Sequence, residues 1–404
     1  MTSVVVLGGG FAGVTAALHL VKKIDKSKEA ITLIDQNTFH LFTPALYEVA
    51  TSEQPQKNIA IPFRSIFGNK LKVITNTIEL IDLKNNKVVL KNKKSLPWDY
   101  MIITLGSQPA YFDIPGMEKH SISLKNLSDA VQIKNNIKKL CEQKLAQNQE
   151  INLVVAGGGF SGTELAAELT NYKNRLSKAN PQFSNLIKIT VIEEKDRLLT
   201  GLDEKVSSVA KKRLEKYGVN LVFNCQIKQV TQDFIEAVSG QKYPYDLLIW
   251  AGGVRASSVL AKCGFKTNTH GQVKVNQNLQ VEGYKNIFAA GDCAEYLDPK
   301  TSKPVPGLGQ IAIAQGKVAG ENVYRQIHSQ KLVDYHYKNY GYLVPLRARF
   351  VVASLNFVKF SGFPAWILQQ LVFLKYLLGI LPFYKAFKKW NKVEQSLAEN
   401  LGNG

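Results

Sequence analysis

Two segments of the 404-residue chain repeat one local pattern, and this repeat restricts the fold more than any other feature. Residues 4–13 read VVVLGGGFAG and residues 153–162 read LVVAGGGFSG. Each copy places an apolar run before a G-x-G-x-x-G turn and a helix-forming stretch after it, which is the order of a dinucleotide-binding βαβ unit. The repeat predicts an α/β chain with two such units.

The first glycine turn predicts a site for one dinucleotide. Gly8 permits the tight turn, Gly10 lets a pyrophosphate approach the backbone, and Gly13 lets helix and strand pack closely. The helix that follows directs its N-terminal amides at the phosphates. The next apolar run ends in Asp35, 22 residues after Gly13, close to the spacing of about 20 residues typical of the acid that binds a ribose. The predicted contacts of this turn also include Phe11 and Ala12.

The second turn repeats the arrangement with Gly157, Gly159 and Gly162. Its second strand ends in Glu193 and Glu194, and Glu193 lies 31 residues after Gly162 because a polar loop lengthens the unit. By alignment with the first turn we assign the ribose contact to Glu193. A carboxylate there repels a 2′-phosphate, so the sequence favours NADH over NADPH. A chain that holds two dinucleotides is most simply a flavin enzyme reduced by a nicotinamide.

Three further segments carry glycines at strand ends. NIFAAGDCAEY, at 286–296, resembles the motif that closes the flavin site of two-dinucleotide flavoproteins, in which the aspartate binds the ribityl chain. WDYMIITLGSQP, at 98–109, and YDLLIWAGGV, at 245–254, look like the strands that return the chain between the two lobes. The residues assigned to cofactor binding from these segments are Gly291, Asp292, Gly106 and Gly252.

Together these motifs resemble those of the type II NADH dehydrogenases, single-subunit NADH:quinone oxidoreductases that pump no protons. The segment 31–53, ITLIDQNTFHLFTPALYEVATSE, resembles the family's loop over the isoalloxazine. The segment 304–323 resembles its quinone-proximal part, written A-Q-x-A-x-Q-x-G, but has Gly309 where the pattern begins with Ala. Residues 353–379 resemble its membrane-binding part. The resemblance covers almost the whole chain and implies FAD, NADH as substrate and a membrane quinone as acceptor. The sequence shows no obvious attachment motif for the flavin, so we expect non-covalent FAD.

Hydride transfer between stacked rings depends on orientation more than on acids or bases, so we expect no catalytic triad. Quinone reduction consumes protons, and Glu168 is our candidate donor; it follows Glu164 by four residues and shares its helical face. The resemblance places Glu164 at the nicotinamide or its ribose, and Glu168 near the junction of flavin and nicotinamide. It also assigns Gln310 to the quinone head group and to the cofactor site. Solvated glutamates on a helix surface and a helix-capping glutamine are the competing interpretations.

The charge of the chain points to an anionic partner, since 51 Lys and Arg against 32 Asp and Glu give a net charge of +19. Residues 335–393 hold nine Lys or Arg and no Asp or Glu, around the apolar and aromatic segment 363–384. This combination predicts a helix lying in the interface of an anionic membrane and excludes nucleic acid. The uncharged run 360–374 has 15 residues, too few for the roughly 20 that span a bilayer. A core helix pair or a dimer interface is the alternative.

We therefore expect two Rossmann-like domains, for FAD and NADH, and a C-terminal membrane-associating helical region. The FAD domain takes in residues 1–112 and 270–330, the NADH domain 113–269 and the membrane-binding region 331–404. The first strand begins almost at the N-terminus, so we expect no signal peptide and a peripheral, monotopic protein on the cytoplasmic face of the membrane. A homodimer is left open.

Two other functions compete with this interpretation. Sulfide:quinone oxidoreductases share the platform but need redox cysteines beside the flavin, and Cys141, Cys225, Cys263 and Cys293 form no convincing pair. A non-catalytic, NADH-sensing membrane-bound flavoprotein would keep both sites without turnover. The six histidines show no ligand spacing, so no metal is predicted.

Overall fold

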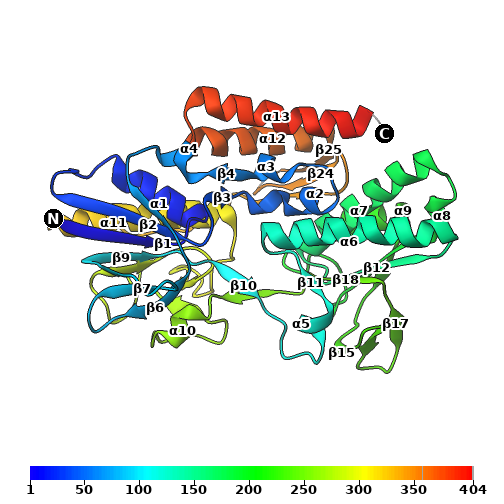
Figure 1. Cartoon of the computed structure of the whole chain (residues 1–404), viewed down its shortest axis with the longest axis horizontal. Coiled ribbons are helices and arrows are strands. Elements are labelled where there is room, and N and C mark those ends of the chain that lie inside the picture. Colours follow the sequence, from blue (N-terminus) through cyan, green and yellow to red (C-terminus); the bar gives the residue numbers. More distant parts are fainter. Residues whose placement is uncertain (357, 403–404) are drawn as a thin grey trace.

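The computed structural model describes residues 1–356 and 358–402 and has an α/β architecture with two lobes side by side (Figure 1). The first lobe is built on a five-stranded parallel sheet in the order β21-β9-β1-β2-β5. Its strands are β1 (Thr2–Leu7), β2 (Glu29–Asp35), β5 (Lys72–Thr75), β9 (Tyr100–Ile103) and β21 (Ile287–Ala289). The sheet thus joins the N-terminal hundred residues to a strand from much later in the chain.

The second lobe repeats the design with residues from the middle of the chain. Its parallel sheet has the order β11-β18-β12-β13-β14. The strands are β11 (Ile122–Ser123), β12 (Ile151–Ala156), β13 (Ile187–Ile192), β14 (Val219–Val222) and β18 (Leu247–Trp250). The central strands β1 and β12 are buried apolar runs, as parallel strands covered on both faces require.

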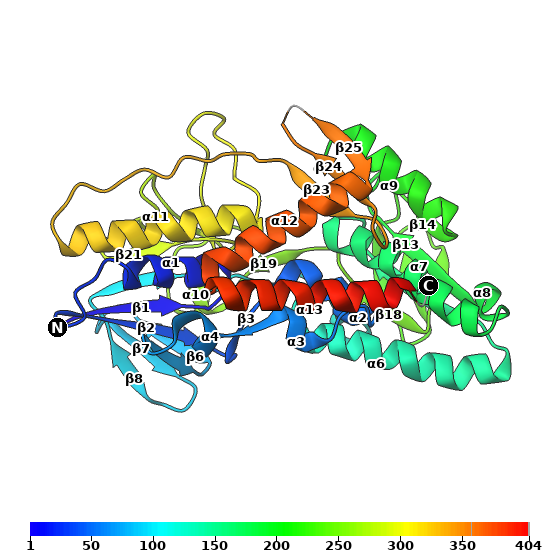
Figure 2. The same cartoon turned by 90° about the horizontal axis from the view of Figure 1, so that it is seen from above.

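Helices cover these sheets, and two of them, α1 and α7, begin at the glycine turns. The main ones are α1 (Phe11–Val21), α6 (Leu127–Lys144), α7 (Phe160–Ala179), α9 (Glu204–Lys216) and α11 (Gly309–Ile327). Helices α1 and α11 lie side by side (Figure 2). A Cβ on Gly316 would stand 2.2 Å from the backbone oxygen of Ala12, so only glycine lets the two helices approach this closely.

Smaller elements connect the lobes and cover their edges. The two chain crossings between the lobes pair as antiparallel strands, β10 (Ser107–Pro109) with β19 (Val254–Ala256). Other short strands are β3 (Phe39–Leu41), β4 (Ala60–Pro62), β6 (Ile78–Asp82), β7 (Lys87–Leu90), β8 (Ser95–Pro97), β15 (Ile227–Val230), β16 (Phe234–Ala237), β17 (Lys242–Pro244), β20 (Val273–Lys274) and β22 (Ala294–Glu295). Short helices are α2 (Leu46–Ala50), α3 (Gln56–Ile59), α4 (Phe63–Phe67), α5 (Met117–His120), α8 (Phe183–Leu186) and α10 (Val259–Lys262).

The C-terminal region forms a layer over both lobes (Figures 1 and 2). It contains two long helices, α12 (Phe363–Ile380) and α13 (Phe383–Gly402), which pack against each other. They are preceded by a three-stranded antiparallel sheet of β23 (Tyr342–Pro345), β24 (Val351–Ser354) and β25 (Lys359–Gly362). The sequence predicts a helical region here but gives no indication of this sheet.

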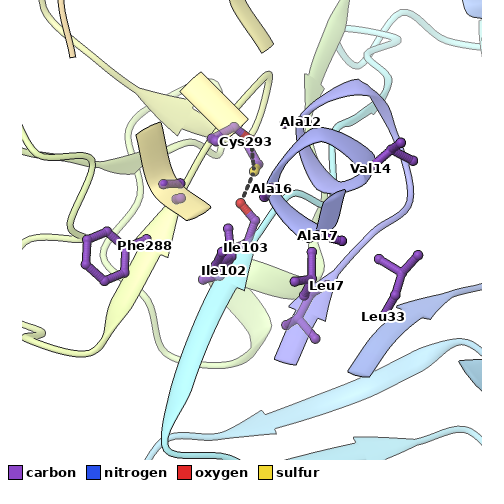
Figure 3. Close-up of a cluster of buried hydrophobic side chains, with 14 of the residues drawn as sticks. Leu7, Ala12, Val14, Ala16, Ala17, Leu33, Ile102, Ile103, Phe288 and Cys293 are labelled. Atoms are coloured by element: carbon purple, nitrogen blue, oxygen red, sulfur yellow. Dashed lines mark hydrogen bonds between the residues drawn. The ribbon is translucent and has the colours of Figure 1, made fainter. Parts of the chain in front are cut away.

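The core of the first lobe brings the sheet and α1 together (Figure 3). Leu7, Leu33 and Ile103 pack under Ala16 and Ala17 of α1. The thiol of Cys293 donates to the carbonyl oxygen of Ile103 at 3.4 Å, and its side chain is fully buried. Cys293 is therefore part of this core.

Candidate functional site

The first glycine turn has the shape that a bound pyrophosphate needs. Gly8 has φ +100°, and a Cβ on it would stand 2.3 Å from the carbonyl oxygen of Thr104. A Cβ on Gly13 would stand 1.9 Å from the carbonyl oxygen of Gly8. Gly10 is at the N-cap position of α1, where a Cβ would meet no other atom within 4 Å. Among the described residues, no side chain accepts a hydrogen bond from the first turn of this helix. The turn therefore leaves the N-terminus of α1 free to bind an anion.

Asp35 closes the first turn from the end of β2. Its Oδ2 accepts the N–H of Gly9 at 2.6 Å and its Oδ1 accepts the N–H of Asn37 at 2.7 Å. Burial raises the pKa of Asp35, and the two backbone donors act in the opposite direction. The carboxylate thus stands beside the turn, where an acid that binds ribose is expected.

The second turn has the same geometry. Gly157 has φ +113°, a Cβ on Gly162 would stand 1.9 Å from the oxygen of Gly157, and Gly159 faces open space at the N-cap of α7. Glu193 accepts the N–H of Gly158 at 2.5 Å, just as Asp35 accepts that of Gly9. The next residue is exposed and pairs with Lys195 instead. The geometry therefore favours our choice between the two glutamates.

The third motif lies at the carboxyl end of β21, beside the first turn. Asp292 Oδ2 accepts the hydroxyl of Ser107 at 2.5 Å and lies 3.6 Å from the ammonium of Lys125. Gly291 has φ +78° and donates its N–H to Gln315 at 2.8 Å. These groups lie around a small hollow lined by Asp292, Gly291 and Gln315. Lys125, which was not predicted from the sequence, brings a cation to Asp292 from the segment before α6.

The other predicted cofactor residues occupy different settings. Gly106 has φ +65° and open space around it, whereas a Cβ on Gly252 would collide with the ring of Trp250. Phe11 packs edge-on against the rings of His40 and Phe42, at 5.0 and 5.9 Å between centroids. Ala12 is buried against α11. Its side chain therefore serves the packing of two helices.

Glu168 lies in a polar cavity between α2, α7 and the C-terminal layer. Its side chain is 6% exposed, and Oε1 accepts the amide of Asn171 at 2.8 Å. Burial raises the pKa of Glu168, and the bond from Asn171 acts against this rise. The same amide donates to Glu53, which forms an ion pair with Arg175. The glutamate is thus held rigidly, away from a solvated helix surface.

Gln310 lies at the first turn of α11, and its amide donates to the carbonyl oxygen of Gly341 at 3.2 Å. It is not among the residues that line the cavity of Glu168. The sixth position of the quinone-proximal pattern is Ala314 in this chain, and the neighbouring Gln315 is bonded to Gly291. Each of these two glutamines thus contacts a backbone group, Gln310 through its NH₂ and Gln315 through its carbonyl oxygen.

The comparisons with known proteins agree with this geometry. Residues 2–316 match the family described as pyridine nucleotide-disulphide oxidoreductase. The chain belongs to that family. It is 26% identical over 394 residues to the type II NADH:quinone oxidoreductase of Staphylococcus aureus, which covers 96% of this chain and 98% of that protein. The resemblance stated from the sequence is confirmed.

Solved structures share the fold. NDH2 from Plasmodium falciparum, solved in complex with NADH, has a TM-score of 0.84 at 19% identity and covers 98% of both chains. The sulfide:quinone oxidoreductase of Aquifex aeolicus has a TM-score of 0.77 at 20% identity, over 97% of this chain and 92% of that one. The predicted fold class, with two dinucleotide-binding units and a C-terminal apolar helix, is confirmed.

The four cysteines of the chain are all free. Cys293 is in the core of the first lobe and Cys141 lies on α6, and burial raises the pKa of each thiol to about 11. Thiols with raised pKa values are poor nucleophiles at neutral pH. Within residues 1–356 and 358–402, no group of three His, Cys, Asp or Glu could hold a metal ion.

Proposed function

We propose that this protein oxidises NADH and passes two electrons through FAD to a quinone. The observation that carries this proposal is the duplicated turn, in which Asp35 and Glu193 each accept the N–H of a middle glycine. One turn serves FAD and the other NADH. The type II NADH:quinone oxidoreductase of Staphylococcus aureus is similar over nearly the full length, and this supports quinone as the acceptor.

The first lobe fits FAD, because the space beside Gly10 is open and no side chain caps the N-terminus of α1. Asp35 binds a ribose and Asp292 the ribityl chain, and the lack of an obvious attachment motif favours non-covalent binding. When bound, FAD accepts a hydride and passes the electrons onward. The residues proposed to hold it are Gly8, Gly10, Phe11, Gly13, Asp35, Gly106, Gly291, Asp292 and Gln310. Ala12 shapes the same turn through its packing on α11.

The second lobe holds NADH in the proposal. Glu193 binds the adenine-side ribose and rejects a 2′-phosphate by charge repulsion. Glu164, on the first turns of α7, orients the nicotinamide end. The residues proposed to contact NADH are Gly157, Gly159, Gly162, Glu164, Glu193 and Gly252.

Quinone reduction uses the side of the molecule that faces the C-terminal layer. The overall reaction, NADH + H⁺ + quinone → NAD⁺ + quinol, takes one proton from solvent per turnover. Gln310 binds the quinone head group, and Glu168 delivers the proton. The buried position of Glu168 supports this role, because burial raises the pKa of its carboxyl and so favours the protonated form.

The domain boundaries follow the sheets. We propose a FAD domain of residues 1–112 and 270–330, an NADH domain of 113–269 and a membrane-binding region of 331–404. The pairing of β21 with β9 supports a discontinuous first domain, and the antiparallel pair β10–β19 supports crossings near both of its inner boundaries.

The C-terminal layer supports membrane binding. Large apolar side chains are exposed on α12 and at the start of α13: Phe363, Ile367, Leu371, Val372, Leu378, Phe383 and Tyr384. Lysines at 375, 385, 388, 389 and 392 accompany them. By length and composition α12 could cross a membrane, but 18 residues are at the short limit of a span. We propose that it lies in the interface of an anionic membrane, on the cytoplasmic face, and that a dimer could share this layer.

Anaerobic rapid mixing tests the proposal. The purified protein is mixed with NADH, and in separate runs with NADPH or sulfide, while flavin absorbance is followed. Bleaching by NADH and recovery on adding a soluble quinone are the expected results. Bleaching by sulfide would support the sulfide:quinone reaction instead. A flavin that stays reduced in the presence of quinone would support the NADH-sensing alternative.

A further inference from the structure

The cavity around Glu168 contains a second carboxyl that the predicted machinery does not use. It is a hollow of about 430 Å³, part of it open to solvent, and Glu48 of α2 lines it together with Glu168 of α7. The remaining wall comes from the loop between β23 and β24, from α12 and from α13. Neither glycine turn contributes to it.

The two carboxyls differ in their partners. The hydroxyl of Tyr47 donates to Glu48 Oε1 at 3.1 Å, and Glu168 accepts the amide of Asn171. Burial and the neighbouring charge of Glu168 raise the pKa of Glu48 to about 8. Burial, together with Glu48, also raises that of Glu164. Two buried carboxyls on one cavity wall oppose each other's ionisation, and they titrate as a pair.

The other charged groups around the cavity are already engaged. On the α7 side Arg175 pairs with Glu53, whose oxygen Asn171 also contacts. From the loop between β23 and β24, Arg347 lies over Tyr217 and Arg349 over Trp366. The charge of Arg347 and a bond from the backbone of Ala348 also lower the pKa of Glu168, against the effect of burial. No ion pair joins Glu48 to a cation within residues 1–356 and 358–402, so little opposes its protonation.

A third carboxyl lies on the C-terminal side of the cavity. Gln370 of α12 lines the wall. In the amide orientation that satisfies both neighbours, its NH₂ donates to Glu394 of α13 at 2.7 Å and its oxygen accepts the indole N–H of Trp366 at 3.1 Å. Burial raises the pKa of Glu394, and the charge of Arg349 acts against this rise. Glu394 is half-buried and contacts the wall residue Gln370, so it lies between the cavity wall and solvent.

We propose that Glu48 and Glu168 share one proton on the wall of this cavity and deliver it for quinone reduction, and that Glu394 lies on the route that resupplies it from solvent. This inference rests on the proposed function, since it names where that reaction takes up its proton. In each turnover a carboxyl O–H breaks and a quinol O–H forms. NADH supplies the electron pair, and water returns the proton to the carboxylate. One shared proton matches the one proton that the overall reaction takes from solvent.

The test compares Glu48→Gln, Glu168→Gln and Tyr47→Phe with the wild type in rapid mixing across a pH range. The rate of flavin reoxidation by a soluble quinone should fall in the wild type as pH rises through the pKa of the pair. Glu48→Gln removes a negative neighbour, so the fall should move to lower pH by about 1 unit or more. Tyr47→Phe removes a hydrogen-bond donor that lowers the pKa of Glu48. In this variant the fall in the reoxidation rate should therefore occur at higher pH than in the wild type.

A second measurement does not depend on turnover. Infrared spectroscopy of the resting protein at neutral pH should show the C=O stretch of a protonated carboxyl, which Glu48→Gln diminishes. Glu282→Gln, an exposed carboxylate paired with Lys274, is the matched control and should change neither readout. An unchanged pH profile and an unchanged carboxyl band in Glu48→Gln would overturn the inference, and Tyr47→Phe keeps the test valid if Glu48→Gln does not fold.

Failure of the proposed function would look different. In that case wild-type flavin would not be reduced by NADH, or would not be reoxidised by quinone at any pH. Reduction by NADH should be the same in Glu282→Gln as in the wild type, because this exposed residue lies outside the cavity and outside both glycine turns.

Discussion

Tyr376 of α12 and His40 of β3 are joined by a hydrogen bond of 2.6 Å between the Tyr376 hydroxyl and His40 Nε2. The other ring nitrogen of His40, Nδ1, lies 3.0 Å from the carbonyl oxygen of Gly9 in the first glycine turn. Because a carbonyl accepts, Nδ1 carries the proton, and Nε2 accepts from tyrosine. The helix of the C-terminal layer is therefore bonded, through one neutral imidazole, to the turn proposed to hold FAD.

Tyr376→Phe should loosen this connection. It leaves Nε2 of a fully buried His40 without a donor, which costs about 1–3 kcal/mol of the free energy of unfolding. FAD retention after gel filtration should fall in parallel, because the imidazole that bonds the Gly9 carbonyl is then held at one nitrogen only. Tyr340→Phe, an exposed tyrosine, is the control for denaturant unfolding and flavin content. Equal stability of the two variants would contradict this view of the Tyr376 bond.

Stability should also depend on pH through His40. Burial lowers the pKa of His40 from 6.5 to about 4. The unfolded chain therefore binds a proton that the folded chain rejects, and this contribution to stability is present above pH 6.5 and is lost as pH falls towards 4. The loss is at most about 1.4 kcal/mol per pH unit. Denaturant titrations of the wild type and His40→Gln should diverge in this window and run parallel above it.

The two kinds of glycine in the first turn should respond differently to substitution. A Cβ on Gly13 meets the backbone oxygen of Gly8, so Gly13→Ala should cost about 1–3 kcal/mol of stability as well as FAD. Gly10 has φ −73° and open space, so Gly10→Ala should fold with a change below about 1 kcal/mol. Its new methyl group nevertheless occupies the place of the pyrophosphate, and FAD should be lost. A Gly10→Ala protein that keeps its flavin would place the pyrophosphate elsewhere.

The glycine turns and their acids could be predicted from sequence because they are local. Gly8, Gly13 and their counterparts are fixed by collisions within one strand–turn–helix unit, and Asp35 and Glu193 reach the turn from the adjacent parallel strand. The cavity could not be predicted in this way. Glu48 meets Glu168 only because α2, α7, α12 and α13 pack together, and no spacing in the chain records that contact. A carboxyl within the apolar run LYEVA was the available signal.

The choice of nicotinamide should follow the charge of Glu193. Glu193→Ala removes the carboxylate that repels a 2′-phosphate, so the kcat/KM for NADPH relative to NADH should rise by about 10-fold, as expected when one charged contact is lost. Glu194→Ala, which removes an exposed carboxylate beside Lys195, is the matched control and should leave the ratio unchanged. If the control changed the ratio instead, the ribose contact would belong to Glu194.

Membrane binding should depend on both the apolar and the basic side chains of the C-terminal layer. Leu371 and Phe383 are 54% and 71% exposed, so replacing both with Ser should weaken co-sedimentation with anionic vesicles. Val238→Ser changes an equally exposed apolar residue of the second lobe and should have no effect. Added salt should weaken binding to anionic vesicles more than to zwitterionic ones, because it screens lysines such as Lys385 and Lys388 from the surface charge. Binding that ignored lipid charge and resisted salt would indicate that the apolar face alone holds the protein at the membrane.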